Sequence, residues 1–183
     1  MQEQKTGIVR RLDYLGRVVL PKEMRKTLRW KDNDPLEMYT VKDELVIKKY
    51  SPTAAILPYA EEVAAGLEGI MEKPCLITDT DAIICATGKY KETVGKKISD
   101  ELDKVIRAGK SVLVAKSDGG EILSPIKNEI FAVQNEIIVP IYAKEIGYGA
   151  VIVFDNENEQ TFNASDVKIV RLAAALLAKR FEE

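Results

Sequence analysis

The stretch KTGIVRRLDYLGRVVLPKEMRKTL, residues 5–28, decides how the first part of the chain folds. Among the first 30 residues, eight are lysine or arginine and three are acidic, so this segment carries a net charge of +5. The whole chain has 183 residues and a net charge of −2. A dense positive segment in an acidic protein indicates a polyanionic partner that binds one face of the molecule.

The charge of the chain changes sign near residue 50. Residues 1–50 contain twelve basic and eight acidic side chains, whereas residues 51–183 contain fifteen basic and twenty-one acidic ones. Ser51, Pro52 and Thr53 lie at this change, and proline disfavours a helical conformation in the residue before it. The sequence therefore predicts two domains, residues 5–51 and residues 53–183, joined by a short linker.

The first domain is predicted to contain four short strands and one short helix. Gly16 is expected in a turn that needs a backbone angle other residues avoid, and Pro21 can begin a helix where its missing N–H costs nothing. About fifty residues in this form are too few to bury a sufficient core, so we expect a second copy of the chain to complete it. The expected strands are residues 6–13, 17–20, 36–41 and 45–50, and the expected helix is residues 22–28.

The second domain is predicted to begin and end with an amphipathic helix. Residues 53–71 and 163–181 repeat apolar side chains at spacings of three and four. Asn163 is a typical N-cap, and Asp166 suits the positive end of the helix dipole. Between the two helices the pattern is α/β, with expected strands at 75–79, 83–87, 111–115, 136–143 and 148–155, a helical segment at 90–108 and a long loop at 116–134.

Composition excludes several kinds of chemistry. The chain contains no histidine, which removes the commonest general base and metal ligand and excludes Ser-His and Cys-His nucleophiles. Cys75 and Cys85 fit neither a CxxC motif nor a zinc site, and we expect two reduced, buried thiols. Asp79 and Asp81 could hold a cation, although aspartates in turns more often bond locally. We therefore predict no catalytic residue, no metal site and no cofactor.

No membrane segment is expected. No apolar run approaches the roughly 18 residues that a membrane-spanning helix needs. The polar start, MQEQKTG, lacks the apolar region of a secretory signal. The sequence therefore predicts a cytoplasmic protein without a membrane partner.

The first domain resembles a known family. The stretches TGIVRRLDYLGRVVLPKEMRKTL and DNDPLEMYTVKDELVIKKY, together about residues 5–50, are similar to the AbrB-type swapped-hairpin DNA-binding domain. The resemblance implies a dimeric β-barrel of two interleaved chains that binds double-stranded DNA through arginines on one face. Carried over by motif, the DNA-binding residues are Lys5, Arg10, Arg11, Arg17, Arg25 and Lys26. Asp13 and Glu23 are expected to hold arginines in place by ion pairs.

The second domain resembles a GAF domain. The resemblance rests on the TVGKKIS segment, the VPIY and GYGAVIVF hairpin and the two flanking helices. It implies an overall α+β fold, with the swapped-hairpin barrel followed by an α/β GAF-like domain. The two helices could pair with a second subunit as a four-helix bundle, which would convert a homodimer into a homotetramer. The loop at 116–134 could enclose an unknown small-molecule effector; a purely structural dimerisation module is the alternative.

Together these features predict a sequence-specific DNA-binding protein, and the resemblance to AbrB-type proteins implies a transcriptional regulator of sporulation genes that acts as activator and repressor. The alternative is an antitoxin-like interaction protein, because related swapped-hairpin domains neutralise toxins. Antitoxins usually carry a disordered tail, whereas this chain ends in a predicted apolar helix. An enzyme built on the GAF-like scaffold is a third possibility, but the chain contains no nucleophile motif that would support it.

Overall fold

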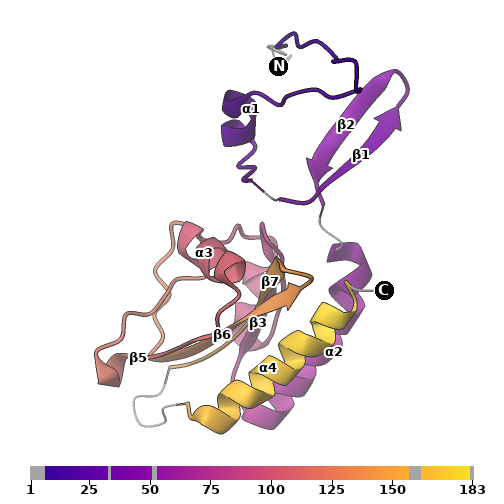
Figure 1. Cartoon of the computed structure of the whole chain (residues 1–183). Helices are drawn as coiled ribbons and strands as arrows, with labels where there is room; N and C mark the ends of the chain where they lie inside the picture. Colours follow the sequence, from indigo (N-terminus) through magenta and orange to yellow (C-terminus); the bar gives the residue numbers. More distant parts are fainter. Residues whose placement is uncertain (1–6, 33, 51–52, 157–161, 182–183) are drawn as a thin grey trace. The chain divides into compact units, whose positions relative to one another are not determined.

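The structure is a computed structural model that describes residues 7–32, 34–50, 53–156 and 162–181. The chain divides into two compact units, Met1–Tyr50 and Ser51–Glu183 (Figure 1). Lys5 and the linker residues Ser51 and Pro52 lie outside the described residues.

The first unit contains a short helix and a β-hairpin. Helix α1 spans Lys22–Thr27 and begins directly after Pro21. Strand β1, Leu36–Val41, pairs antiparallel with β2, Glu44–Lys49, around a turn at Lys42. The predicted helix and the predicted second hairpin are therefore confirmed.

The two predicted strands before α1 are wrong for the single chain. The described residues 7–13 and 17–20 are irregular, although a tight turn joins them. Gly16 has a φ of +76°, as its place in a turn predicted, and its N–H donates to the Asp13 carbonyl at 3.0 Å. A strand needs a neighbouring strand for its N–H and C=O groups. One copy of the chain places no such neighbour along these described residues.

The second unit is built on a five-stranded antiparallel sheet with the strand order β4-β3-β7-β6-β5. Every predicted strand of this unit is present, with its ends within two residues of the prediction. Helices and antiparallel strands together place the chain in the α+β class. The strands are β3, Cys75–Thr78; β4, Ile83–Ala86; β5, Val112–Ala115; β6, Asn135–Ala143; and β7, Ile146–Asp155.

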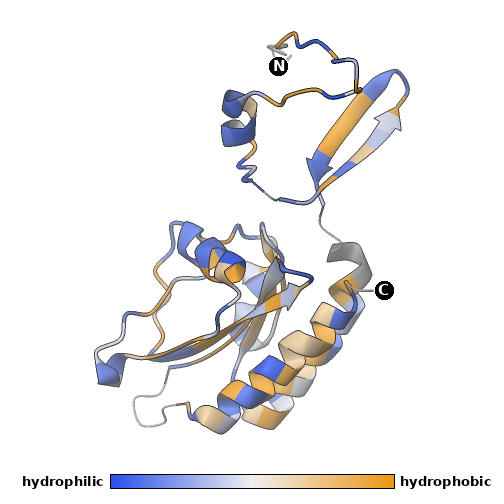
Figure 2. Ribbon diagram, in the orientation of Figure 1, coloured by the Kyte–Doolittle hydropathy of each residue, from blue (hydrophilic) through white to orange (hydrophobic). Residues whose placement is uncertain are grey.

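Two helices lie side by side on one face of this sheet: α2, Thr53–Met71, and α4, Ala164–Lys179 (Figure 1). Helix α4 begins at the predicted cap, because the Asn163 side chain accepts from backbone N–H groups and Asp166 accepts from the Asn163 N–H at 2.7 Å. Apolar residues recur along both helices (Figure 2). Those facing the sheet form one core with it, which includes Ile56, Ala60, Ala64, Leu67, Ile137, Val139, Val151, Val153, Val170, Ala174 and Leu177.

The opposite face of the sheet is covered by helix α3, Asp100–Ala108, and by the long loop. The predicted helical segment at 90–108 is two elements, the 3-10 helix η1, Gly88–Thr93, and α3, with Gly95 at a φ of +86° between them. The predicted loop at 116–134 is confirmed, apart from one short turn of 3-10 helix, η2, Lys116–Asp118. A second core lies beneath it, which includes Leu102, Ile106, Phe131, Ile138, Ile152 and Phe154.

Candidate nucleic-acid interface

Most of the predicted DNA-binding residues that the structure describes are exposed on the first unit. Arg10, Arg11 and Arg17 lie in the segment before α1, and Lys26 lies in α1 itself. Arg10, Arg11 and Lys26 form no ion pair with any acidic residue in the described part of the chain. Their charges are therefore available to a polyanion. Lys5 lies outside the described residues.

Asp13 holds the turn that carries Arg17. Its Oδ1 accepts the backbone N–H groups of Leu15, at 2.9 Å, and Arg17, at 2.8 Å, and its Oδ2 accepts Arg17 Nε at 2.8 Å. These hydrogen bonds, with that of the Arg17 backbone N–H the strongest cause, lower the pKa of Asp13 below its ordinary value. The predicted ion pair of Asp13 is confirmed, and Arg17 is positioned while 68% of its side chain stays exposed.

Arg25 is half-buried and differs from the other arginines. Its Nη1 lies 3.0 Å from Oδ1 of Asp32, which follows α1 in the chain. This ion pair ties α1 to the following turn, so Arg25 has a structural role that the sequence alone did not indicate. The expected ion pair of Glu23 stays a prediction.

The same unit exposes a large amount of apolar surface. Val9, Tyr14 and Val19 expose 89%, 93% and 79% of their surface. Large exposed apolar surface on a soluble protein usually marks an interaction site. Further exposed apolar residues of this unit are Ile8, Leu12, Leu15, Val18, Met24, Leu28, Met38, Val41 and Leu45.

One carboxyl group is buried in the second unit. Glu136, on β6, is fully buried; its Oε1 accepts the Leu123 N–H at 2.6 Å, and its Oε2 has no hydrogen-bond partner among the described residues. Burial raises its pKa to about 7, against the opposing effect of the Leu123 hydrogen bond. The sequence did not indicate a role for Glu136, because a glutamate at the start of a strand usually faces water. Glu136 and Ile138 are two residues apart on the same strand, so both side chains lie on the sheet face that the loop covers. This spacing was the signal that could have indicated the burial of Glu136.

The other candidate residues have structural roles. Asp79 Oδ1 accepts the N–H groups of Asp81 and Ala82, each at 2.7 Å, as local turn chemistry predicts. Cys75 and Cys85 are unpaired and buried, and burial raises the pKa of both thiols. No group of three or more potential metal ligands occurs among the described residues. None of the helices in that part of the chain is long and apolar enough to cross a membrane.

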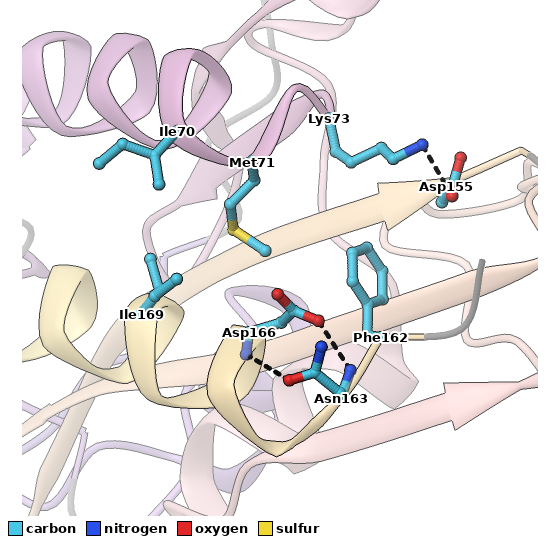
Figure 3. Close-up of a pocket in the computed structure, with 8 residues that line it drawn as sticks. All are labelled: Ile70, Met71, Lys73, Asp155, Phe162, Asn163, Asp166 and Ile169. Carbon is cyan, nitrogen blue, oxygen red and sulfur yellow. Dashed lines mark hydrogen bonds and ion pairs between the residues drawn. The ribbon is translucent and has the colours of Figure 1, made fainter.

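A pocket of about 270 Å³ lies where α2 ends and α4 begins (Figure 3). Lys73 Nζ forms an ion pair with Asp155 Oδ2 at 3.0 Å across it, and Asn163 and Asp166 close its other side through the helix cap. Because these polar groups already bind one another, the pocket offers a ligand few groups with which to form hydrogen bonds.

Comparisons with known proteins identify the family. The family model described as "Stage V sporulation protein T C-terminal, transcription factor" matches residues 56–182. Stage V sporulation protein T of Bacillus subtilis (strain 168) is 36% identical over 180 residues, which cover 97% of this chain and 98% of that protein. The chain belongs to the stage V sporulation protein T family.

The N-terminal unit of this family member is AbrB-like. The transition state regulatory protein AbrB of B. subtilis (strain 168) is 49% identical over 49 residues, 27% of this chain and 51% of that protein. Residues 9–55 also match a family model described as "Antidote-toxin recognition MazE, bacterial antitoxin". The predicted resemblance of the first domain is therefore confirmed.

Solved structures confirm the GAF-like fold of the second unit. The GAF domain of an Acinetobacter phosphoenolpyruvate-protein phosphotransferase aligns with a TM-score of 0.58 at 15% identity, over 69% of this chain and 82% of that one. The GAF-B domain of DevS from Mycobacterium smegmatis aligns with a TM-score of 0.56 at 13% identity, over 71% of this chain and 93% of that one. At these identities the likeness shows the fold alone.

Glu136 is expected to make stability depend on pH. Its pKa rises from an ordinary 4.5 to about 7 in the folded protein, so the folded state holds the proton more tightly. Its contribution to stability is complete below pH 4.5 and is lost as pH rises through 7. From this group we expect a loss of roughly 3 kcal/mol in unfolding free energy by pH 8, measured by urea unfolding.

Glu136→Gln should abolish this loss, because the amide does not ionise. Glu121→Gln, at an exposed position on the same loop, is the matched control and should keep the pH dependence of the unchanged protein. Equal pH dependence in both variants would contradict the assignment to Glu136.

Proposed function

We propose that this protein is a sequence-specific DNA-binding transcriptional regulator of sporulation genes that acts as activator and repressor. The observation that carries the proposal is the set of exposed cations on an AbrB-like unit in a member of a transcription-factor family. We assign the DNA-binding domain to residues 5–51 and the GAF-like domain to residues 53–183. The proposed DNA-binding residues are Lys5, Arg10, Arg11, Arg17, Arg25 and Lys26.

Among the proposed DNA-binding residues, Arg17 has the side-chain geometry that best suits DNA binding. Asp13 binds its Nε and thereby orients the guanidinium, which leaves the Nη groups for a phosphate or for bidentate contact with guanine. When DNA binds, the Arg25 guanidinium would leave the Asp32 carboxylate and pair with a phosphate instead. Most of the affinity should come from phosphate neutralisation, with base contacts adding selectivity.

A second copy of the chain completes the DNA-binding unit in this proposal. Residues 7–13 and 17–20 pair with the same segments of the partner, which satisfies their backbone groups and covers apolar side chains such as Val9 and Val19. The pairing also doubles the positive charge on the DNA-binding face. Exposed apolar surface on an otherwise small unit supports this arrangement.

The GAF-like unit extends the dimer to a homotetramer. The outer faces of α2 and α4 expose Ile70, Leu172 and Leu176 by 70%, 63% and 50%. Beside them, the Arg180 guanidinium lies 4.2 Å from the centre of the Tyr59 ring. Two such helix pairs, from two subunits, would bury these residues as a four-helix bundle. We further propose that the opposite face, under the loop at 116–134, senses a small molecule.

The antitoxin model that matches residues 9–55 raises a second candidate function. The residues that follow this match argue against the antitoxin function, because they do not form a toxin-wrapping tail. They make a GAF-like unit in which α4 packs Val170, Ala174 and Leu177 against the sheet. DNA binding therefore remains the better-supported function, and no catalytic activity is proposed.

Arg17→Ala is expected to abolish operator binding at physiological salt while the protein stays oligomeric. If each protomer neutralises about 4 phosphates, the log affinity of a dimer should fall with log salt at a slope near −7. At low salt, where the variant still binds, its slope should be smaller by about 2. Fluorescence anisotropy with operators captured from genomic DNA measures both quantities. Lys42→Ala, in the β1–β2 turn, is the control, and normal binding by Arg17→Ala would refute the role of Arg17.

Two sets of substitutions should separate the two self-association surfaces. Val19→Glu should break the first pairing, and Leu172→Glu with Leu176→Glu should break the second, because each buries a charge in an apolar contact. Either set alone should convert a tetramer to a dimer, and both together should give a monomer. Analytical ultracentrifugation of the full chain measures the mass.

Lys104→Glu, on the opposite face of the GAF-like unit, should leave the tetramer intact. A chain that stays tetrameric with both sets of substitutions would rule out these surfaces.

A further inference from the structure

Glu136 has a carboxylate oxygen that the fold does not use. It lies on β6 between Val114 of β5 and Phe154 of β7, on the sheet face that the loop at 116–134 covers. Oε1 holds the Leu123 N–H, whereas the buried Oε2 has no hydrogen-bond partner among the described residues. Buried polar groups in native proteins are nearly always paired, so an unused carboxylate oxygen indicates a place for an external donor.

A groove of about 510 Å³ lies on the loop that covers this carboxylate. Ile122 and Ser124, the two neighbours of Leu123, line it together with Ile130 and Phe131. Its volume lies in the range of roughly 300–1,000 Å³ that small-molecule sites occupy. Ile130 is 97% exposed, and such an apolar side chain at the mouth of a groove can cover a ligand.

Aromatic rings connect the groove to Glu136. The Phe131 ring lies 4.7 Å from the ring of Phe154, the cross-strand neighbour of Glu136, and Tyr90 lies 4.6 Å from Phe154. Aromatic rings attract organic cations, and a carboxylate accepts hydrogen bonds from N–H donors most strongly when the donor is charged. A neutral donor would form a weaker hydrogen bond with this oxygen, and an anionic ligand would be repelled by it.

We propose that the GAF-like unit binds a small organic cation, an amine or amidine, whose N–H group donates to Glu136 and whose apolar part lies against Ile122, Ile130 and Phe131. This inference rests on the proposed sensing role and assigns it a ligand class. Because the same carboxylate holds the Leu123 N–H, ligand binding acts directly on the loop at 116–134. The loop segment at 122–124 must shift to admit the donor, since the carboxylate is covered.

The test uses the full-length protein and three probes that share one ring: benzamidine, benzyl alcohol and benzoate. Calorimetry at pH 8 should show benzamidine binding at least roughly tenfold more tightly than the other two, the effect expected for a charge-assisted hydrogen bond. Glu136→Gln should lose roughly tenfold or more of the benzamidine affinity. Gln keeps the shape and can still accept the Leu123 N–H, so the variant should fold. Glu101→Gln, at an exposed position of α3 that does not line the groove, should bind as the unchanged protein does.

Two results would overturn the inference: equal benzamidine binding by Glu136→Gln and the unchanged protein, or no binding of benzamidine, agmatine or tryptamine by the unchanged protein. Tighter binding of benzoate or benzyl alcohol would also refute the ligand class, while leaving a sensing role in place. Operator binding measured on the same samples separates this inference from the proposed DNA-binding function, which depends on Arg17 and not on Glu136.

Discussion

The backbone hydrogen bonds of residues 7–20 are the constraint on which the DNA-binding unit depends. Each N–H and C=O group there needs a partner, and among the described residues the backbone–backbone hydrogen bonds of this segment lie at the turn between Asp13 and Arg17. The same residues expose apolar side chains. In the proposed dimer a second chain would meet both needs with one contact, so dimer formation and DNA binding would depend on each other.

In the proposed function, the turn at Asp13 would also restrain a flexible arginine before it contacts DNA. A free arginine loses side-chain entropy when it binds DNA. Arg17 has already lost part of it, because Asp13 binds both its backbone N–H and its Nε. Arg25 is restrained in another way, by Asp32. The two residues should therefore contribute differently: Arg17 through geometry, and Arg25 through an exchange of one anion for another.

In the GAF-like unit, the two faces of one sheet serve different purposes. Neighbouring residues of β6 alternate between them, so Ile137 packs with the core under α2 and α4, whereas Ile138 packs with the core under α3 and the loop. The first face places α2 and α4 where their outer surfaces can meet another subunit. The second face holds Glu136 and the groove. A ligand on one face and a partner on the other would thus act on the same central strands.

Features that depend on local order along the chain can be predicted from the sequence alone. Spacings of three and four define α2 and α4, the Asn163–Asp166 cap marks where α4 begins, and the AbrB-like motif identifies the DNA-binding unit. The strands of the GAF-like sheet also follow from short apolar runs. Contacts between groups that are distant in the sequence are evident only in the folded structure. Period-two alternation cannot say whether a strand has a neighbour, so the strands expected at 6–13 and 17–20 were wrong for one copy. The burial of Glu136 depends on residues 123 and 154, which lie far from each other in the sequence. Such contacts arise from packing, and local pattern does not record them.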